Sequence, residues 1–143
     1  MPYRFLEEEA TADVAFEAWG KDLAGVFRDA ADAVINVMID NIHAVEPRET
    51  RPFEIENRQL DLLLFNALEQ LVYYKDAQQL LLRLNGVSVS RHDERWRVHA
   101  VGAGERLDLT RHHQHVDVKA ITLHDFSLKQ TDGEWRAHVI LDI

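Results

Sequence analysis

The sequence predicts an α+β fold in which two helices pack on a mostly antiparallel sheet of about seven strands. Three observations support this prediction. Apolar residues recur at three- and four-residue spacing in two stretches, as on the buried face of a helix. Elsewhere, short segments alternate between apolar and polar residues, as in a half-buried strand. Most of these segments are joined by short turns, which connect antiparallel neighbours.

Two short strands and a helix are predicted first. The strands run from Tyr3 to Glu7 and from about Val14 to Trp19, and Gly20 ends the second. Asp22 can cap the following helix, because its carboxylate can accept hydrogen bonds from the first turn. The apolar stripe of this helix consists of Leu23, Phe27, Ala30, Val34 and Met38. Its last part, residues 33–39, is apolar nearly all round, so we expect it to be deeply buried.

The second predicted helix follows a third strand. Residues 50–56 alternate, and Pro52 places this strand at an edge or makes it a strand start, because proline cannot donate to a ladder. Asn57 is the predicted cap of the helix. Its stripe consists of Leu60, Leu63, Leu64, Ala67, Leu68, Leu71 and Val72, and Tyr73 and Tyr74 close it.

The remainder of the chain is predicted to be strands. The leucine-rich segment around residues 80–89 contains Gly86, which indicates a bend or bulge. Asp132-Gly133 indicates a hairpin turn, since both residues tolerate positive φ. The other expected features are a turn over 91–94, a strand over 95–100 broken by Gly102-Ala103-Gly104, a polar connection over 105–115, strands over 116–124 and 126–129, and a final strand over 134–143.

Composition narrows the classes of function. A chain of 143 residues with 46% hydrophobic content predicts a single folded domain over residues 1–143. No apolar run approaches the roughly 20 residues that span a bilayer, and no secretory signal is evident, so a cytoplasmic location without membrane contact is expected. The absence of cysteine excludes disulfides and thiolate sites. The net charge of −9 argues against direct nucleic-acid binding and is compatible with cation binding, with docking onto a basic protein, or with solubility alone.

Asp13 and Asp142 are the first candidate site. Each lies on the polar parity of a predicted strand, Asp13 where its strand starts and Asp142 where the final strand ends, next to the Ile143 carboxylate. If these ends meet, an all-oxygen cluster results, which suits Ca²⁺ or Mg²⁺. Spacing alone favours the simpler interpretation, two solvated acids at strand ends.

Three histidines and a lysine are further candidates. His112, His113 and His115 follow Asp108, and such residues can bind zinc. Because they lie in a polar connection, hydrogen-bonding histidines are the favoured interpretation. Lys119 interrupts an apolar strand; it is either buried against an acid, in contact with a ligand, or, as the favoured interpretation, exposed or ion-paired. No nucleophile elbow, Walker-type loop or dinucleotide fingerprint is present.

Five stretches and the end of the chain together form a pattern that covers nearly the full length. The most specific pieces are the lysine-containing strand, Val118 to His124, and the terminal Leu141-Asp142-Ile143. The others are Phe5-Leu6-Glu7 through Thr11-Ala12-Asp13, Ala30 to Asp40, Leu60 to Tyr73 with Leu68-Glu69-Gln70-Leu71, and Gly104-Glu105-Arg106-Leu107-Asp108 to Arg111-His112. In these stretches the chain resembles the archease family.

This resemblance implies an archease-like sandwich and a non-enzymatic protein cofactor of the RtcB-type RNA ligase. Such cofactors promote guanylylation of the ligase and its multiple turnover in tRNA splicing or RNA repair. The resemblance also implies a divalent cation, usually calcium, bound by Asp13, Asp142 and the backbone oxygen of Ile143. One position departs from the family pattern, because Ala10, after Glu7-Glu8-Glu9, stands where archeases usually have a histidine.

Two other classes of function remain open at this stage. A stand-alone metal-dependent hydrolase of phosphoesters would use the same acids to activate water. A general chaperone or scaffold would need no cation.

Overall fold

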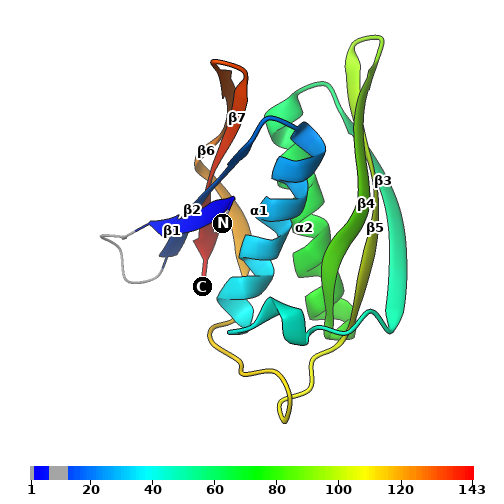
Figure 1. The fold of residues 1–143 in the computed structure, drawn as a ribbon, viewed down its shortest axis with the longest axis vertical. Helices are drawn as coiled ribbons and strands as arrows, with labels where there is room; N and C mark the ends of the chain where they lie inside the picture. The colour runs from blue at the N-terminus through cyan, green and yellow to red at the C-terminus, as the bar shows by residue number, and fades with distance from the viewer. Residues whose placement is uncertain (1, 7–12) are drawn as a thin grey trace.

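The two helices lie between two antiparallel sheets in the computed structural model, which describes residues 2–6 and 13–143 (Figure 1). One sheet has four strands in the order β1-β2-β7-β6, and the other has three in the order β3-β5-β4. The predicted α+β class and strand number are confirmed for these residues. The strands divide between two sheets, so that each helix has a sheet on both sides.

The four-stranded sheet is built from the two ends of the chain. Its strands are β1 (Tyr3–Leu6), β2 (Asp13–Gly20), β6 (Ala120–Thr131) and β7 (Glu134–Asp142). The final strand forms as predicted and pairs with β2 on one side and β6 on the other. Asp132 (φ 54°) and Gly133 (φ 77°) make the predicted hairpin turn between β6 and β7.

The first helix, α1 (Leu23–Met38), begins as its sequence indicates. The Asp22 carboxylate accepts a hydrogen bond from the Ala24 amide at 3.2 Å. The C-terminal half of the helix is buried from both sides, and Val34 and Ile35 are inaccessible to solvent. A short 3₁₀ turn, η1 (Ile42–Ala44), follows the helix.

The second helix, α2 (Leu60–Gln78), is one turn longer than predicted and is capped differently. Asn57 is the last residue of β3 (Glu49–Asn57), and its side chain accepts from the Gln59 amide, two residues too early to cap the helix. The helix continues past Tyr74 because Lys75 is buried on its apolar face. Gln79, in the left-handed region at φ 54°, ends it.

In the three-stranded sheet, one predicted strand end is wrong. β5 (Arg95–Arg106) runs straight through Gly102-Ala103-Gly104, which we predicted would break it. The glycines permit a close approach of β4 (Leu80–His92), since a Cβ atom at Gly104 would collide with the Leu81 carbonyl. The predicted bend in β4 is confirmed, because the pairing register shifts between Leu84 and Val87. As Pro52 indicated, β3 is an edge strand.

A second correction concerns the segment before β7. We predicted separate strands over 116–124 and 126–129; the structure has a single strand, β6, whose register shifts between Thr122 and Ser127. Residues 116–119 precede this strand and belong to the connection that follows Arg106. Asp125 adopts φ 51° within the irregular part, which allows the strand to continue beyond it.

Candidate functional site

Asp13 and Asp142 lie directly opposite each other. They are register partners, Asp13 as the first residue of β2 and Asp142 as the last residue of β7, and both are partly exposed. Partners in an antiparallel pair project to the same face, with Cβ atoms about 4.5–5.5 Å apart. The strand ends that the sequence placed at opposite ends of the chain therefore do meet, and Ile143 follows immediately.

The end of β7 is fixed from the other side by the main chain of β6. The Lys119 amide donates to the Asp142 carbonyl oxygen at 2.8 Å, and Ala120 is the register partner of Asp142. The Lys119 side chain is exposed, in agreement with the interpretation that sequence favoured. Thus this residue contributes its backbone to the site.

The donors at this point are all oxygen. Among the described residues, no group of three or more His, Asp or Glu side chains is arranged to hold a metal ion. A cation here would therefore depend on two carboxylates, a main-chain oxygen such as that of Ile143, and water, which are the donors that hard divalent cations prefer. Ala10 and Glu7-Glu8-Glu9 lie outside the described residues.

The predicted histidine group does not converge on one point. The buried His112 accepts a hydrogen bond from the Asp108 amide at Nδ1 (2.9 Å), so its Nε2 carries the proton that faces Glu105 at 3.2 Å. His113 and His115 are exposed and face Asp40. The Asp108 carboxylate accepts from the Thr110 amide and hydroxyl groups. The hydrogen-bonding interpretation therefore describes these residues, and they form no zinc site.

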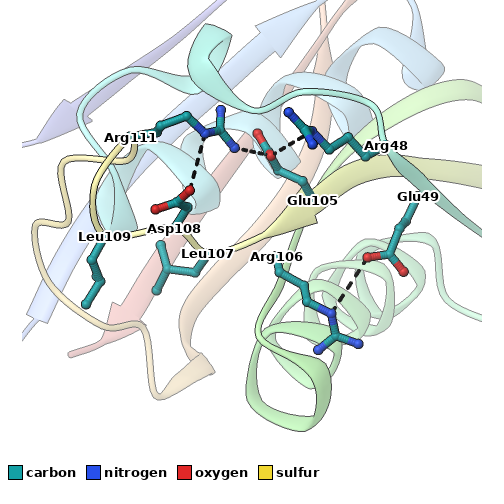
Figure 2. A pocket seen from close by; sticks show the side chains of 8 residues that line it. All are labelled: Arg48, Glu49, Glu105, Arg106, Leu107, Asp108, Leu109 and Arg111. Carbon is teal, nitrogen blue, oxygen red and sulfur yellow. Dashed lines mark hydrogen bonds and ion pairs between the residues drawn. The ribbon is translucent and has the colours of Figure 1, made fainter.

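A polar hollow of about 610 Å³ lies beside Glu105, and Figure 2 shows the side chains that line it. Arg48 and Arg111 both point to Glu105, which is only 3% exposed, and Arg106 faces Glu49. Because each arginine already has a carboxylate partner, the hollow offers no unsatisfied cationic group to an anion. Its side chains instead clamp the connection after β5 onto the three-stranded sheet.

Glu105 is charged in this clamp. Burial by itself would raise the pKa of its carboxyl group. Hydrogen bonds from the Glu46 amide (2.7 Å), from Arg111 and from His112 outweigh burial, so the pKa lies below its ordinary value. The sequence alone indicated no role for Glu105, since its partners come from two other segments, Glu46 and Arg48 before β3 and Arg111 and His112 after β5.

Lys75 is the buried lysine of this protein. Its Nζ donates to the Asp117 carboxylate at 2.6 Å and to the Val118 carbonyl at 2.8 Å, and it also pairs with Asp76. Burial lowers the pKa of the amine, but the bonds to Asp117 and Asp76 outweigh it and raise the pKa. Lys75 thereby holds the segment whose next residue, Lys119, donates to Asp142. Its spacing of three and four residues from Val72 and Leu71 is the signal that could have identified it.

Comparisons with known proteins give a consistent result. The model of the archease protein family (MTH1598/TM1083) matches residues 3–143. The protein archease of Pyrococcus abyssi is 35% identical over 141 residues, covering 98% of this chain and 99% of the relative. That of Methanopyrus kandleri is 34% identical over 143 residues, with complete coverage of both chains.

Two solved structures share the fold. The solution structure of Methanobacterium thermoautotrophicum protein 1598 matches with a TM-score of 0.85 and 31% identity, over 99% of each chain. A crystal structure from Thermotoga maritima, described as "an archease, possible chaperone", matches with a TM-score of 0.64 and 14% identity over 96% of each chain. Within the described residues, no helix has the length and apolar character to cross a membrane. From the family match and the full-length relatives, this chain belongs to the archease family.

Proposed function

We propose that this protein is a non-enzymatic activator of an RtcB-type RNA ligase. It promotes guanylylation of the ligase and its multiple turnover in tRNA splicing or RNA repair. The observation that supports this most is the meeting of Asp13 and Asp142, the two acids that the archease resemblance implicates, on adjoining strand ends. With a net charge of −9, the protein acts through the ligase and makes no direct contact with RNA.

The proposal includes a divalent cation, calcium, held by the carboxylates of Asp13 and Asp142 and the main-chain oxygen of Ile143. Calcium takes six to eight oxygen ligands, so water or groups of the ligase complete the shell. The acidic end of the molecule approaches the metal-bearing active site of the ligase and binds more tightly to the state that reacts with GTP. Only such a difference in affinity shifts the ligase toward that state.

A guanylylation assay tests the proposal directly. Adding this protein to its cognate ligase with GTP is expected to increase the rate at which the ligase–GMP adduct forms. The amount of adduct is measured as the labelled GMP that becomes attached to the ligase. An unchanged rate at saturating protein contradicts the proposal. Turnover of RNA or phosphoesters without any ligase would instead support a hydrolase, and cation-independent binding of many unfolded clients would support a chaperone.

The cation site has its own test in Asp13→Asn and Asp142→Asn. Each variant removes one of two facing carboxylates, so calcium affinity measured by calorimetry is expected to fall by at least about tenfold. Asp132→Asn is the matched control: it makes the same change of charge in the hairpin turn, where φ is 54° and asparagine is tolerated. Wild-type affinity in both site variants would refute the site, and an equal loss in the control would indicate an effect of net charge alone.

A further inference from the structure

One peptide group connects helix α2 to the end of β7. The carbonyl oxygen of Val118 and the amide of Lys119 belong to this peptide group, which directly precedes β6. The oxygen accepts a hydrogen bond from the Lys75 amine at 2.8 Å, and the amide donates to the Asp142 carbonyl oxygen at 2.8 Å. Because the C=O and N–H of a trans peptide point in opposite directions, these groups form a continuous hydrogen-bonded chain from α2 to β7.

This chain starts from a buried charge. Lys75 is only 9% exposed, and Val118 is inaccessible to solvent. A hydrogen bond from a charged donor is roughly twice as strong as one between neutral groups. It also polarises the peptide group that accepts it, which strengthens the bond that the Lys119 amide donates in turn. The exposed carboxylates of Asp117 and Asp76 pair with the same amine and hold it in place.

The hydrogen-bonded chain ends on the main chain of the candidate cation site. The Asp142 carbonyl oxygen already accepts a bond from the Lys119 amide, which favours Ile143 as the source of a main-chain oxygen for the cation. Ile143 lies beyond the end of β7, and its nitrogen is bonded to the carbonyl carbon of Asp142. Fixing this carbonyl group therefore also fixes the direction in which the Ile143 main chain begins.

We propose that Lys75 is a positioning residue for the cation site. Through the peptide group of Val118 and Lys119, its amine orients the Asp142 carbonyl group, and with it Ile143. This inference rests on the proposed function and extends the site to α2, which supplies none of the proposed ligands. Removing a group that orients metal ligands typically lowers metal affinity by tenfold or more. The simpler alternative is that Lys75 only stabilises the fold through its ion pairs.

Lys75→Met tests the proposal, because methionine keeps a long unbranched side chain and lacks the amine. Calcium affinity, measured by calorimetry, is expected to fall about tenfold. Loss of a positive charge makes the protein more negative and by itself would raise its affinity for a cation. A fall therefore cannot come from net charge. Lys129→Met is the matched control, since it makes the same change of charge at an exposed position of β6, and its calcium affinity is expected not to fall.

Amide hydrogen exchange of the calcium-free protein gives a second measurement. Without the amine, the Lys119 amide is expected to exchange faster in Lys75→Met, relative to the amides of β5 in the other sheet. Asp117→Asn removes one ion pair of Lys75 and leaves its bond to Val118, so exchange at Lys119 and calcium affinity are expected to stay close to wild type. In the wild type, calcium is expected to slow exchange at Lys119, because coupling between two groups is reciprocal.

The outcomes separate the positioning role from the proposed function. Weaker calcium binding by Lys75→Met, with Lys129→Met and Asp117→Asn unaffected, supports the role. Wild-type affinity in Lys75→Met, or an equal loss in Asp117→Asn, overturns it and leaves the cation site standing. If Lys75→Met does not fold, the wild type decides, and exchange at Lys119 that does not respond to calcium overturns the role. A wild type that binds no calcium overturns both role and site, whereas one that binds calcium without activating the ligase overturns only the ligase function.

Discussion

Replacing Gly104 by alanine is expected to remove most or all of the stability of the fold. Gly104 lies on β5 opposite Leu82, and an added Cβ would collide with the Leu81 carbonyl oxygen. It would also lie 2.8 Å from the Leu81 carbonyl carbon and 3.1 Å from the Leu82 Cα. These are backbone atoms of a paired strand, so relief requires β4 and β5 to separate. We expect a loss of about 4 kcal/mol or more in the free energy of unfolding.

Gly102→Ala is the matched control for this substitution. A Cβ at Gly102 would approach the Leu82 Cδ1 at 2.9 Å, which is the far end of a flexible side chain. A loss of about 1–3 kcal/mol is expected there, as for ordinary overpacking. Urea denaturation of the two variants makes the comparison. Equal losses would show that the close approach of β4 at Gly104 has no special cost.

Glu105→Gln is expected to destabilise the protein by about 2–4 kcal/mol at pH 7. The substitution keeps the shape of the side chain but removes the negative charge that Arg48 and Arg111 face (Figure 2) and that His112 also contacts. Arg48 and Arg111 then lose the buried carboxylate that both of them face. Thermal unfolding and urea denaturation both measure the loss. Glu94→Gln, an exposed position in the turn between β4 and β5, is the control and is expected to change little.

The stabilisation that the Glu105 carboxylate provides is expected to decrease at acidic pH. Its pKa is lowered in the folded protein relative to the ordinary value of 4.5. The carboxylate therefore contributes its full stabilisation above about pH 4.5 and loses it as the pH falls through the lower, folded pKa. The difference in unfolding free energy between wild type and Glu105→Gln should narrow with acidification in this range. A difference that stays constant from pH 7 to pH 3 would contradict the role of the charge.

The local sequence was sufficient to predict those elements whose structure depends on their own residues. The alternation in 134–143, the Asp22 cap and the Asp132-Gly133 turn all formed as predicted. The bend in β4 at Gly86 also agrees, because a glycine at positive φ suits an irregular point of a strand.

The predictions failed at positions where the local structure or the burial of a residue depends on a neighbouring element. Glycines usually interrupt strands, yet Gly102 and Gly104 lie inside β5, because β4 approaches closely there. The cluster at Glu105 and the burial of Lys75 depend on segments 42 or more residues away in sequence for part of their partners. Periodicity detects the buried face of one element and contains no information about which distant segment covers it.

The candidate site divides in the same way. Parity placed Asp13 and Asp142 on polar strand faces, and only the pairing of β2 with β7 brings them together. An apolar groove of about 320 Å³ between β1, α1 and the connection before β6 was not predicted, because Phe5, Val37 and Val116, which help to line it, belong to three separate segments, each with an ordinary apolar residue. Nothing in any one of these segments indicates a shared surface.

The position of β7 also determines when the molecule can be completed during synthesis. The three-stranded sheet and both helices are encoded by the continuous segment 23–106 and can assemble as the chain emerges. The four-stranded sheet cannot, because β7 lies between β2 and β6, so β2, paired only with β1, waits for more than a hundred further residues before its second neighbour exists. Such long-range pairing slows folding. The carboxylates of Asp13 and Asp142 thus face each other only after β7 has been synthesised and has paired with β2.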